Sequence, residues 1–219
     1  TTVAWGATNT WNPDGQTPNN IYANAILNQT NAATPWGASI NASTTLNMDM
    51  GANAIALNSF RMTNTGTAPT NPNNVTVNVV GVAGSSLTLN QIVKTAGGTL
   101  QFGPTLPIFT TVDAAYNPSG NLRVANTDDS AIQLQGQLNV PGNLVKDGTG
   151  LLRFGTSTAA FNNNIAGDII VNGGTLQASN GTSGNVLAGS GKVIINGVGS
   201  VLTLNADYSA DFGRDIVIN

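Results

Sequence analysis

One phrase of the sequence occurs twice. Residues 91–103 read QIVKTAGGTLQFG, and residues 143–155 read NLVKDGTGLLRFG, which aligns with the first copy without a gap. At an interval of 52 residues the copies share Lys94/Lys146, Gly98/Gly150, Leu100/Leu152, Phe102/Phe154 and Gly103/Gly155. A repeat of this kind indicates a building unit that buries its apolar side chains only against neighbouring units. We therefore expect stacked repeats rather than one globular core.

Short segments that alternate apolar and polar residues recur along the chain, as strands buried on one face do. They are VTVNVVGV (75–82), SLTL (86–89), TLQF (99–102), NLRV (121–124), IQLQGQL (132–138), LLRF (151–154), DIIV (168–171), TLQ (175–177), KVII (192–195), VLTL (201–204) and DIVI (215–218). The connections are rich in Asn-Gly, Gly-Gly, Asp-Gly and Ser-Gly, which supply the positive φ of tight corners. The sequence therefore predicts an all-β fold.

The repeated phrases run in the same direction, which favours a coil over hairpins. GSSLTLN at 84–90 returns as GSVLTLN at 199–205, and DIIVN at 168–172 returns as DIVIN at 215–219. In a β-solenoid, equivalent residues of successive turns stack at about 4.8 Å, so that apolar columns form inside and Asn or Thr rows can hydrogen-bond. We expect a parallel β-solenoid with roughly 20 to 25 residues per turn.

The first seventy residues are less regular. They contain all three tryptophans and two Pro- and Asn-rich loops, at 12–20 and 67–74. We expect residues 1–74 to form an irregular or capping β segment that is continuous with the turns of residues 75–219. Because the chain begins without a start Met and stops inside an apparent strand, we also expect it to be part of a longer polypeptide, truncated at residue 219.

Composition argues against several classes of protein. Only 8% of the residues are charged, all ten acidic residues are Asp, and His and Cys are absent. Without them there is no imidazole base, no Ser-His-Asp triad and no thiolate metal site, so we do not expect an enzyme or a bound metal. The net charge of −3 with scattered basic residues argues against a nucleic-acid partner. No apolar run is long enough for membrane insertion.

Residues 142–177, GNLVKDGTGLLRFGTSTAAFNNNIAGDIIVNGGTLQ, resemble the autotransporter-associated β-strand repeat. The shared succession is Lys-x-Gly-x-Gly, a Leu-rich strand, an Asn-containing loop, a short strand, and Gly-Gly-Thr-Leu beginning at Gly173 and Gly174. The resemblance continues to residue 219. It implies a right-handed parallel β-helix in the exported part of a bacterial surface protein, where it would act as a stalk, an adhesin or a matrix component. An extracellular or cell-surface location follows from the same resemblance.

The repeat positions are expected to be structural, because an active site is usually built once. They are Lys94, Gly98, Phe102, Lys146, Gly150, Phe154, Gly173 and Gly174. Two basic residues on predicted strands, Arg123 and Arg153, invite comparison with β-helical lyases, but the repetition of the lysines favours a structural role.

Three further groups are candidate sites. Trp5, Trp11 and Trp36 are candidate glycan contacts, with capping of one solenoid end as the alternative. The adjacent Asp128 and Asp129 could serve a sugar-cleaving enzyme, although a solvated turn is the simpler interpretation. Asp147 could cap backbone amides or hold Ca²⁺ together with Asp14, Asp168 and nearby carbonyls, but no EF-hand pattern or GGxGxD repeat is present.

Three functions remain open. The first is a structural extracellular β-helix, a segment of a surface fibre or stalk whose partner is the rest of a longer chain or another copy stacked end to end. The second is a carbohydrate-binding adhesin that contacts surface glycans through its tryptophans. The third is a polysaccharide lyase or hydrolase.

Overall fold

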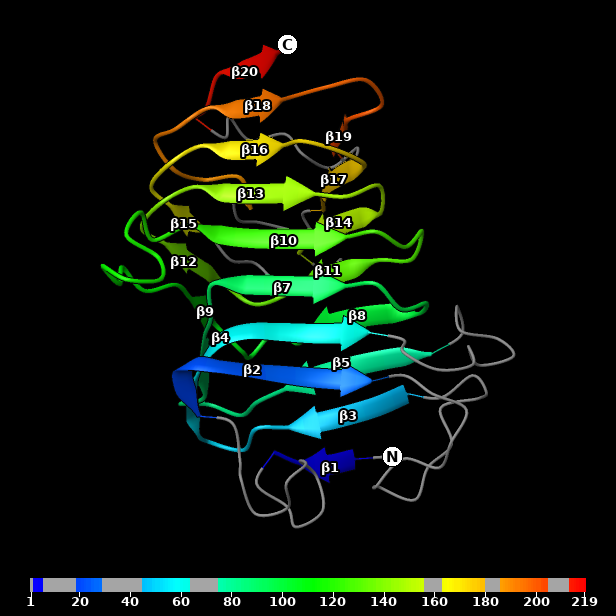
Figure 1. Ribbon diagram of the computed structural model, residues 1–219, viewed down its shortest axis with the longest axis vertical. Helices are drawn as coiled ribbons and strands as arrows, with labels where there is room; N and C mark the ends of the chain where they lie inside the picture. Colours follow the sequence, from blue (N-terminus) through cyan, green and yellow to red (C-terminus); the bar gives the residue numbers. More distant parts are fainter. Residues whose placement is uncertain are drawn as a thin grey trace.

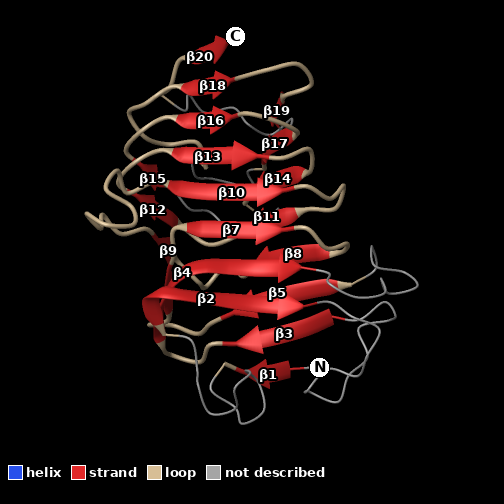
Figure 2. Ribbon diagram, in the orientation of Figure 1, coloured by secondary structure: helices blue, strands red, loops and turns tan. Residues whose placement is uncertain are grey.

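The computed structural model of the protein describes residues 2–5, 19–28, 45–63, 75–155, 163–179, 186–204 and 213–219. Within these ranges the backbone forms strands, turns and bends, and no helix (Figure 2). The prediction of an all-β fold is confirmed. The described strands belong to two sheets, and all the pairings between them are parallel.

The first sheet has eight strands in the order β1-β3-β5-β8-β11-β14-β17-β19. Their bounds are β1 Thr2–Ala4, β3 Thr45–Asp49, β5 Thr76–Val80, β8 Thr99–Phe102, β11 Ile132–Leu134, β14 Leu151–Phe154, β17 Thr175–Ala178 and β19 Val201–Leu204. The order rises steadily along the chain, so each new strand of this sheet is laid beside the previous one.

The second sheet has twelve strands in two arms that share β4 (Ala54–Thr63). The first arm continues from the N-terminal part of β4 through β6 Ser86–Thr88, β9 Ile108–Phe109, β12 Leu138–Val140 and β15 Asn164–Ile165. The second arm comprises β2 Asn20–Asn28, the C-terminal part of β4, β7 Gln91–Lys94, β10 Leu122–Asn126, β13 Leu144–Asp147, β16 Ile169–Val171, β18 Val193–Ile195 and β20 Ile216–Ile218.

From β3 to β16 the chain passes through the eight-stranded sheet, the first arm and the second arm in turn, and then begins the next layer (Figure 1). The register makes the layers explicit, because Leu100, Ile132, Leu152 and Leu176 stand in one column. The steps of this column are 32, 20 and 24 residues. The repeat of 52 residues therefore spans two layers.

The core consists of columns of inward side chains. Leu100, Ile132 and Leu152 are fully buried, and each lies against the equivalent residue of the next layer. A second column contains Phe102 and Phe154 with Leu134 between them. Full burial of one such side chain contributes roughly 1.5 to 3 kcal/mol, and that contribution depends on the neighbouring layers being present.

Rows of polar side chains run along the outside. In the eight-stranded sheet, Gln101 donates to Asn78 at 3.2 Å and Asn78 donates to Asn47 at 3.2 Å. Beside the second arm, a row that we call the asparagine ladder comprises Asp147, Asn172, Asn196 and Asn219. Each asparagine Nδ2 donates to the Oδ1 of the preceding member, at 2.9, 3.0 and 2.7 Å. These amide rows provide polar surface without charge.

The irregular character predicted for residues 1–74 concerns mostly residues outside the described ranges. The described strands of that part join the sheets of the later layers: β1 pairs with β3, β2 pairs with β4, and β3 and β4 pair with strands beyond residue 74.

Candidate functional site

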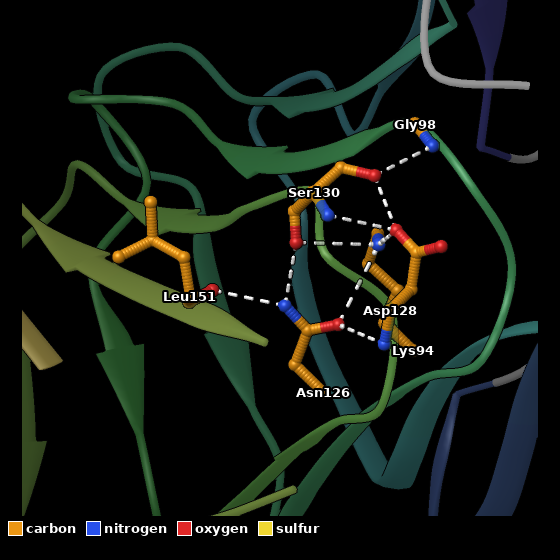
Figure 3. Close-up of polar contacts among 6 residues, drawn as sticks. All are labelled: Lys94, Gly98, Asn126, Asp128, Ser130 and Leu151. Atoms are coloured by element: carbon orange, nitrogen blue, oxygen red, sulfur yellow. Dashed lines mark hydrogen bonds and ion pairs between the residues drawn. The ribbon is translucent and has the colours of Figure 1, made fainter. Parts of the chain in front are cut away.

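A buried lysine with its partners forms one polar cluster inside the fold (Figure 3). The Lys94 side chain is fully buried, and its Nζ lies 2.7 Å from Oδ1 of Asp128. Asp128 also accepts hydrogen bonds from the backbone N–H and the hydroxyl of Ser130. The Ser130 hydroxyl oxygen in turn accepts the Gly98 N–H at 3.0 Å. Asn126 Nδ2 closes the corner by donating to the carbonyls of Ser130 and Leu151, at 2.6 and 2.9 Å.

The electrostatics of this cluster fit a structural ion pair. Burial lowers the pKa of Lys94, and the carboxylate of Asp128 offsets part of that effect. Burial would raise the pKa of Asp128, but hydrogen bonds from Lys94 and Ser130 outweigh it and hold that pKa below its usual value. Asp129 is exposed. The adjacent carboxylates therefore have different environments, and Asp128 is occupied by its partners.

The second repeat lysine is satisfied by backbone instead of a carboxylate. Lys146 is fully buried and donates to the carbonyls of Asp147, Gly148 and Gly173 at 3.0, 2.7 and 3.0 Å. Burial lowers the pKa of Lys146 to about 8, although the nearby Asp147 opposes that effect. The lysine thus ties the corner after β13 to the corner after β16.

The two repeat lysines, which align in the sequence, do not occupy equivalent positions in the strand register. Lys94 is in register with Asn126, whereas Lys146 is in register with Val124, two residues earlier. The reason is the length of the corner. Eight residues lead from Ile92 to Leu100 in the β7–β8 layer, but only six lead from Lys146 to Leu152 in the β13–β14 layer. The phenylalanines of the repeat do share a column.

The repeat glycines lie at corners. Gly98, Gly150 and Gly174 each stand one residue before a strand of the eight-stranded sheet, at the same register position. Gly98 and Gly174 have φ of 86° and 64°. A Cβ on Gly150 would lie 2.0 Å from the Asp128 carbonyl oxygen, and one on Gly173 would lie 3.2 Å from the Gly148 carbonyl oxygen. Close approach of neighbouring layers accounts for these glycines.

Arg214 is a buried cation that the sequence analysis missed. Its guanidinium donates to the carbonyls of Leu187, Gly167, Ile165 and Ala188. Burial lowers the pKa of Arg214. The partners are backbone groups some 26 to 49 residues away, so no side-chain pattern could have revealed the site.

The expected glycan contact at Trp5 is corrected by its burial. Trp5 is 2% exposed and packs against Phe60 with ring centroids 6.3 Å apart. The backbone N–H of Trp5 donates a hydrogen bond to the carbonyl of Asp49, the last residue of β3. A ring in this position cannot stack on a sugar. Trp11 and Trp36 lie outside the described residues.

The suggested calcium ligands do not come together. Asp147 ends β13 and Asp168 precedes β16, and because β13 and β16 are parallel neighbours, the two residues lie at opposite ends of this strand pair. Asp147 accepts hydrogen bonds from Arg123 and Asn172. Asp14 is outside the described residues, and within the described ranges no three acidic side chains gather as a metal site would require.

A surface groove lies where the segment between β9 and β10 meets the second arm. The segment, residues 110–121, stands out from the side of the body (Figure 1). The groove has a volume of about 260 Å³, and its walls come from Asn90 and Gln91 at β7, Arg123 on β10, and residues 116–119 and Asn121 of the segment.

An exposed tyrosine, Tyr116, lines this groove and packs against a second exposed tyrosine, Tyr22. Tyr116 is 62% exposed and Tyr22, on β2, is 53% exposed. Their ring centroids are 4.7 Å apart at an interplanar angle of 47°. Of the two rings Tyr116 lines the groove, so Tyr116 gives it an aromatic wall beside polar side chains. Nothing in the sequence connected Tyr22, Tyr116 and Arg123, because the strand order alone brings them together.

No family model matches the chain. Neither the curated proteins nor the solved structures contain a match. The described residues include no helix long and apolar enough to cross a membrane.

Proposed function

We propose that the protein is a segment of a closed, right-handed parallel β-solenoid that serves as a structural part of an extracellular bacterial fibre or stalk, without catalysis. The observation that carries the proposal is the continuous stack of parallel layers, in which each column of Leu, Ile, Val and Phe is buried by the layers on either side. Stacking of layers in this way produces an elongated molecule rather than one that encloses a binding site. The resemblance to the autotransporter-associated repeat supports the handedness and the surface location.

The polar interior supports the same proposal. Lys94, Lys146 and Arg214 are all buried, and each binds groups at corners between layers. A cation used in this way joins one layer to the next and is not available to a substrate. For the lyase or hydrolase alternative, the pairing of Asp128 with Lys94 is unfavourable, since a catalytic carboxylate must reach its substrate.

The C-terminal layer offers a surface for continuing the stack. Ile216 and Ile218 on β20 are 45% and 79% exposed, whereas Val193 in the layer below is fully buried. The asparagine ladder runs to the same layer and ends at Asn219. An added parallel strand would bury both isoleucines and extend the ladder. We propose that the partner is either further chain of the same polypeptide or another copy stacked end to end.

Electron cryomicroscopy of the native material tests the structural function. We expect elongated particles or filaments with a repeat near 4.8 Å along the axis. For the purified chain, Ile216→Lys with Ile218→Lys should block any end-to-end assembly, because charges would be placed in the new contact. Val112→Lys is the matched control, since Val112 is 63% exposed in the connection between β9 and β10, several strands away from β20. Compact particles without an axial repeat would contradict the proposal.

An adhesin remains the second candidate function, and a specific observation favours it. The groove, with the exposed Tyr116 in its wall and Tyr22 against that ring, is a surface feature that the structural function does not use.

A further inference from the structure

We propose that the groove between β7, β10 and the segment 110–121 binds a neutral saccharide. The proposal deepens the second candidate function, the adhesin, by naming its ligand class and site. It does not depend on the structural function, because a stalk could carry the groove or lack it. It also differs from the expected glycan contact through tryptophans, since Trp5 is buried on the inside.

The groove is built from a rigid loop. Asn117 is 8% exposed, and its Nδ2 donates to Asn90 Oδ1 at 2.9 Å and to the carbonyls of Thr111 and Asn121 at 3.1 and 3.0 Å. Its Oδ1 accepts the Asn121 N–H at 2.9 Å. The side-chain amide of Asn117 therefore connects parts of the segment with one another and with Asn90, the residue before β7. Such preorganisation lowers the entropic cost of binding.

The tip of the loop is held by a carboxylate, that of Asp113. Asp113 Oδ1 accepts the N–H groups of Ala115 and Tyr116 at 3.0 and 2.9 Å. The backbones of Asp113 and Asn117 exchange two hydrogen bonds, of 3.0 and 2.9 Å. The loop thus carries Tyr116 on a closed turn, and the ring rests against Tyr22. An aromatic residue that is more than half exposed is fixed here in one position.

The aromatic wall suits the apolar face of a sugar ring. A pyranose presents C–H groups on its faces and hydroxyls around its edge, so it packs on an aromatic ring while its edge makes hydrogen bonds. Tyrosine offers both an apolar face and a polar tip at low entropic cost. At Tyr116 the ring is exposed and polar side chains line the groove beside it.

The polar side of the groove has unused hydrogen-bonding capacity. Within the described part of the chain, the side chains of Gln91 and Ser119 and the hydroxyl of Tyr116 make no hydrogen bond to protein. Together they can both donate and accept. Hydroxyl groups also do both, so a polyhydroxylated ligand can satisfy them, whereas a purely anionic group would use only the donors.

The charge balance indicates a neutral ligand. Arg123 is the charged residue in the groove wall, its side chain is 60% exposed, and its Nη2 lies 2.9 Å from Oδ2 of Asp147. The carboxylate of Asp147 thus offsets the guanidinium charge, and the remaining N–H groups of Arg123 can donate to sugar hydroxyls. A volume of about 260 Å³ in an open groove suits part of a glycan chain rather than an enclosed small molecule.

Isothermal titration of the whole chain tests the proposal. The probes are neutral hexasaccharides of glucose, mannose and galactose, with a hexagalacturonate as the anionic comparison. We expect at least one neutral hexasaccharide to bind with a dissociation constant in the millimolar range or below. If no neutral probe binds, or if the uronate alone binds, the proposal is overturned.

Variants locate the site. Tyr116→Ala should weaken binding by about tenfold or more, whereas Tyr116→Phe should stay within about threefold, because it keeps the ring. Val112→Ala is the matched control: Val112 is 63% exposed in the same segment but does not line the groove, so binding should be unchanged. Circular dichroism verifies that each variant is folded. Full-strength binding by a folded Tyr116→Ala variant would overturn the assignment.

Discussion

At the scale of single residues, buried cations hold the corners of this protein together. Lys94 uses a carboxylate, while Lys146 and Arg214 use backbone carbonyls. A buried charge is costly unless it is hydrogen-bonded; Lys94 and Lys146 each donate three hydrogen bonds, and Arg214 donates four. The corners are places where the parallel ladder is interrupted and carbonyls would lack partners. A cation with several N–H groups can donate hydrogen bonds to these carbonyls, whereas an apolar side chain cannot.

Lys146 should make the stability of the protein depend on pH. Its pKa is about 8 in the folded protein, against an ordinary value of 10.5. Between these two values the unfolded chain binds more protons than the folded one, so the free energy of unfolding should rise with pH, by up to about 3 kcal/mol. Denaturant unfolding at pH 7 to 10 measures this, and Lys146→Met should reduce the rise.

The control for that experiment is Lys192→Met, because Lys192 is exposed. The control variant should retain the slope of the native protein. Equal slopes in the native protein and in Lys146→Met would show that the buried amine is not the source.

At the scale of strands and corners, corner length decides which side chains become neighbours. The strands themselves follow from the alternation of apolar and polar residues, and Phe102, Leu134 and Phe154 share a column as strand periodicity requires. The number of residues in a corner then sets the register of the strand that precedes the corner. Lys94 is therefore in register with Asn126, whereas Lys146 is in register with Val124. Glycine sets how closely one corner can lie on the next.

Substitution at Gly174 should separate backbone strain from crowding. Gly174 has φ +64°, and an added Cβ would lie 2.4 Å from the Thr149 carbonyl oxygen. Gly199 has φ +83° and nothing within 4 Å. Gly199→Ala should therefore cost about 1 to 2 kcal/mol from the backbone alone, and Gly174→Ala should cost about 1 to 3 kcal/mol more. Denaturant unfolding measures the free energy of unfolding of both variants. Equal losses would mean that the neighbouring layer moves away from the added methyl group without an energetic cost.

Sequence reasoning reached the all-β class, many of the strands and their parallel direction, because these depend on local periodicity and on the repeated phrases. It could not reach Arg214, whose partners are carbonyls of distant residues. It could not reach the groove either, since Tyr22 and Tyr116 meet only through strand order. Tryptophan content suggested a binding surface, but burial depends on packing that composition does not determine, and Trp5 lies inside.

At the scale of the whole molecule, the layers should differ in local stability. Strands β10 and β13 have parallel neighbours on both sides, whereas β20 pairs on one side among the described strands. Backbone amides in β10 and β13 should therefore exchange hydrogen much more slowly than those in β20. Hydrogen exchange followed by mass spectrometry measures the gradient. Equal exchange rates in β20 and β13 would indicate a single cooperative unit or a covered C-terminal layer.

The asparagine ladder has a consequence for the chemical lifetime of the protein. Asn172 and Asn196 are each followed by glycine, the dipeptide in which the next backbone nitrogen most readily attacks the side-chain carbonyl and releases ammonia. In the ladder, both the nitrogen and the oxygen of each of these amides are engaged, which keeps the side chain from rotating onto that backbone. Stacking thus slows deamidation at both sites. Once layers separate, the reaction can leave a carboxylate beside Asp147, and the ladder would then resist re-forming.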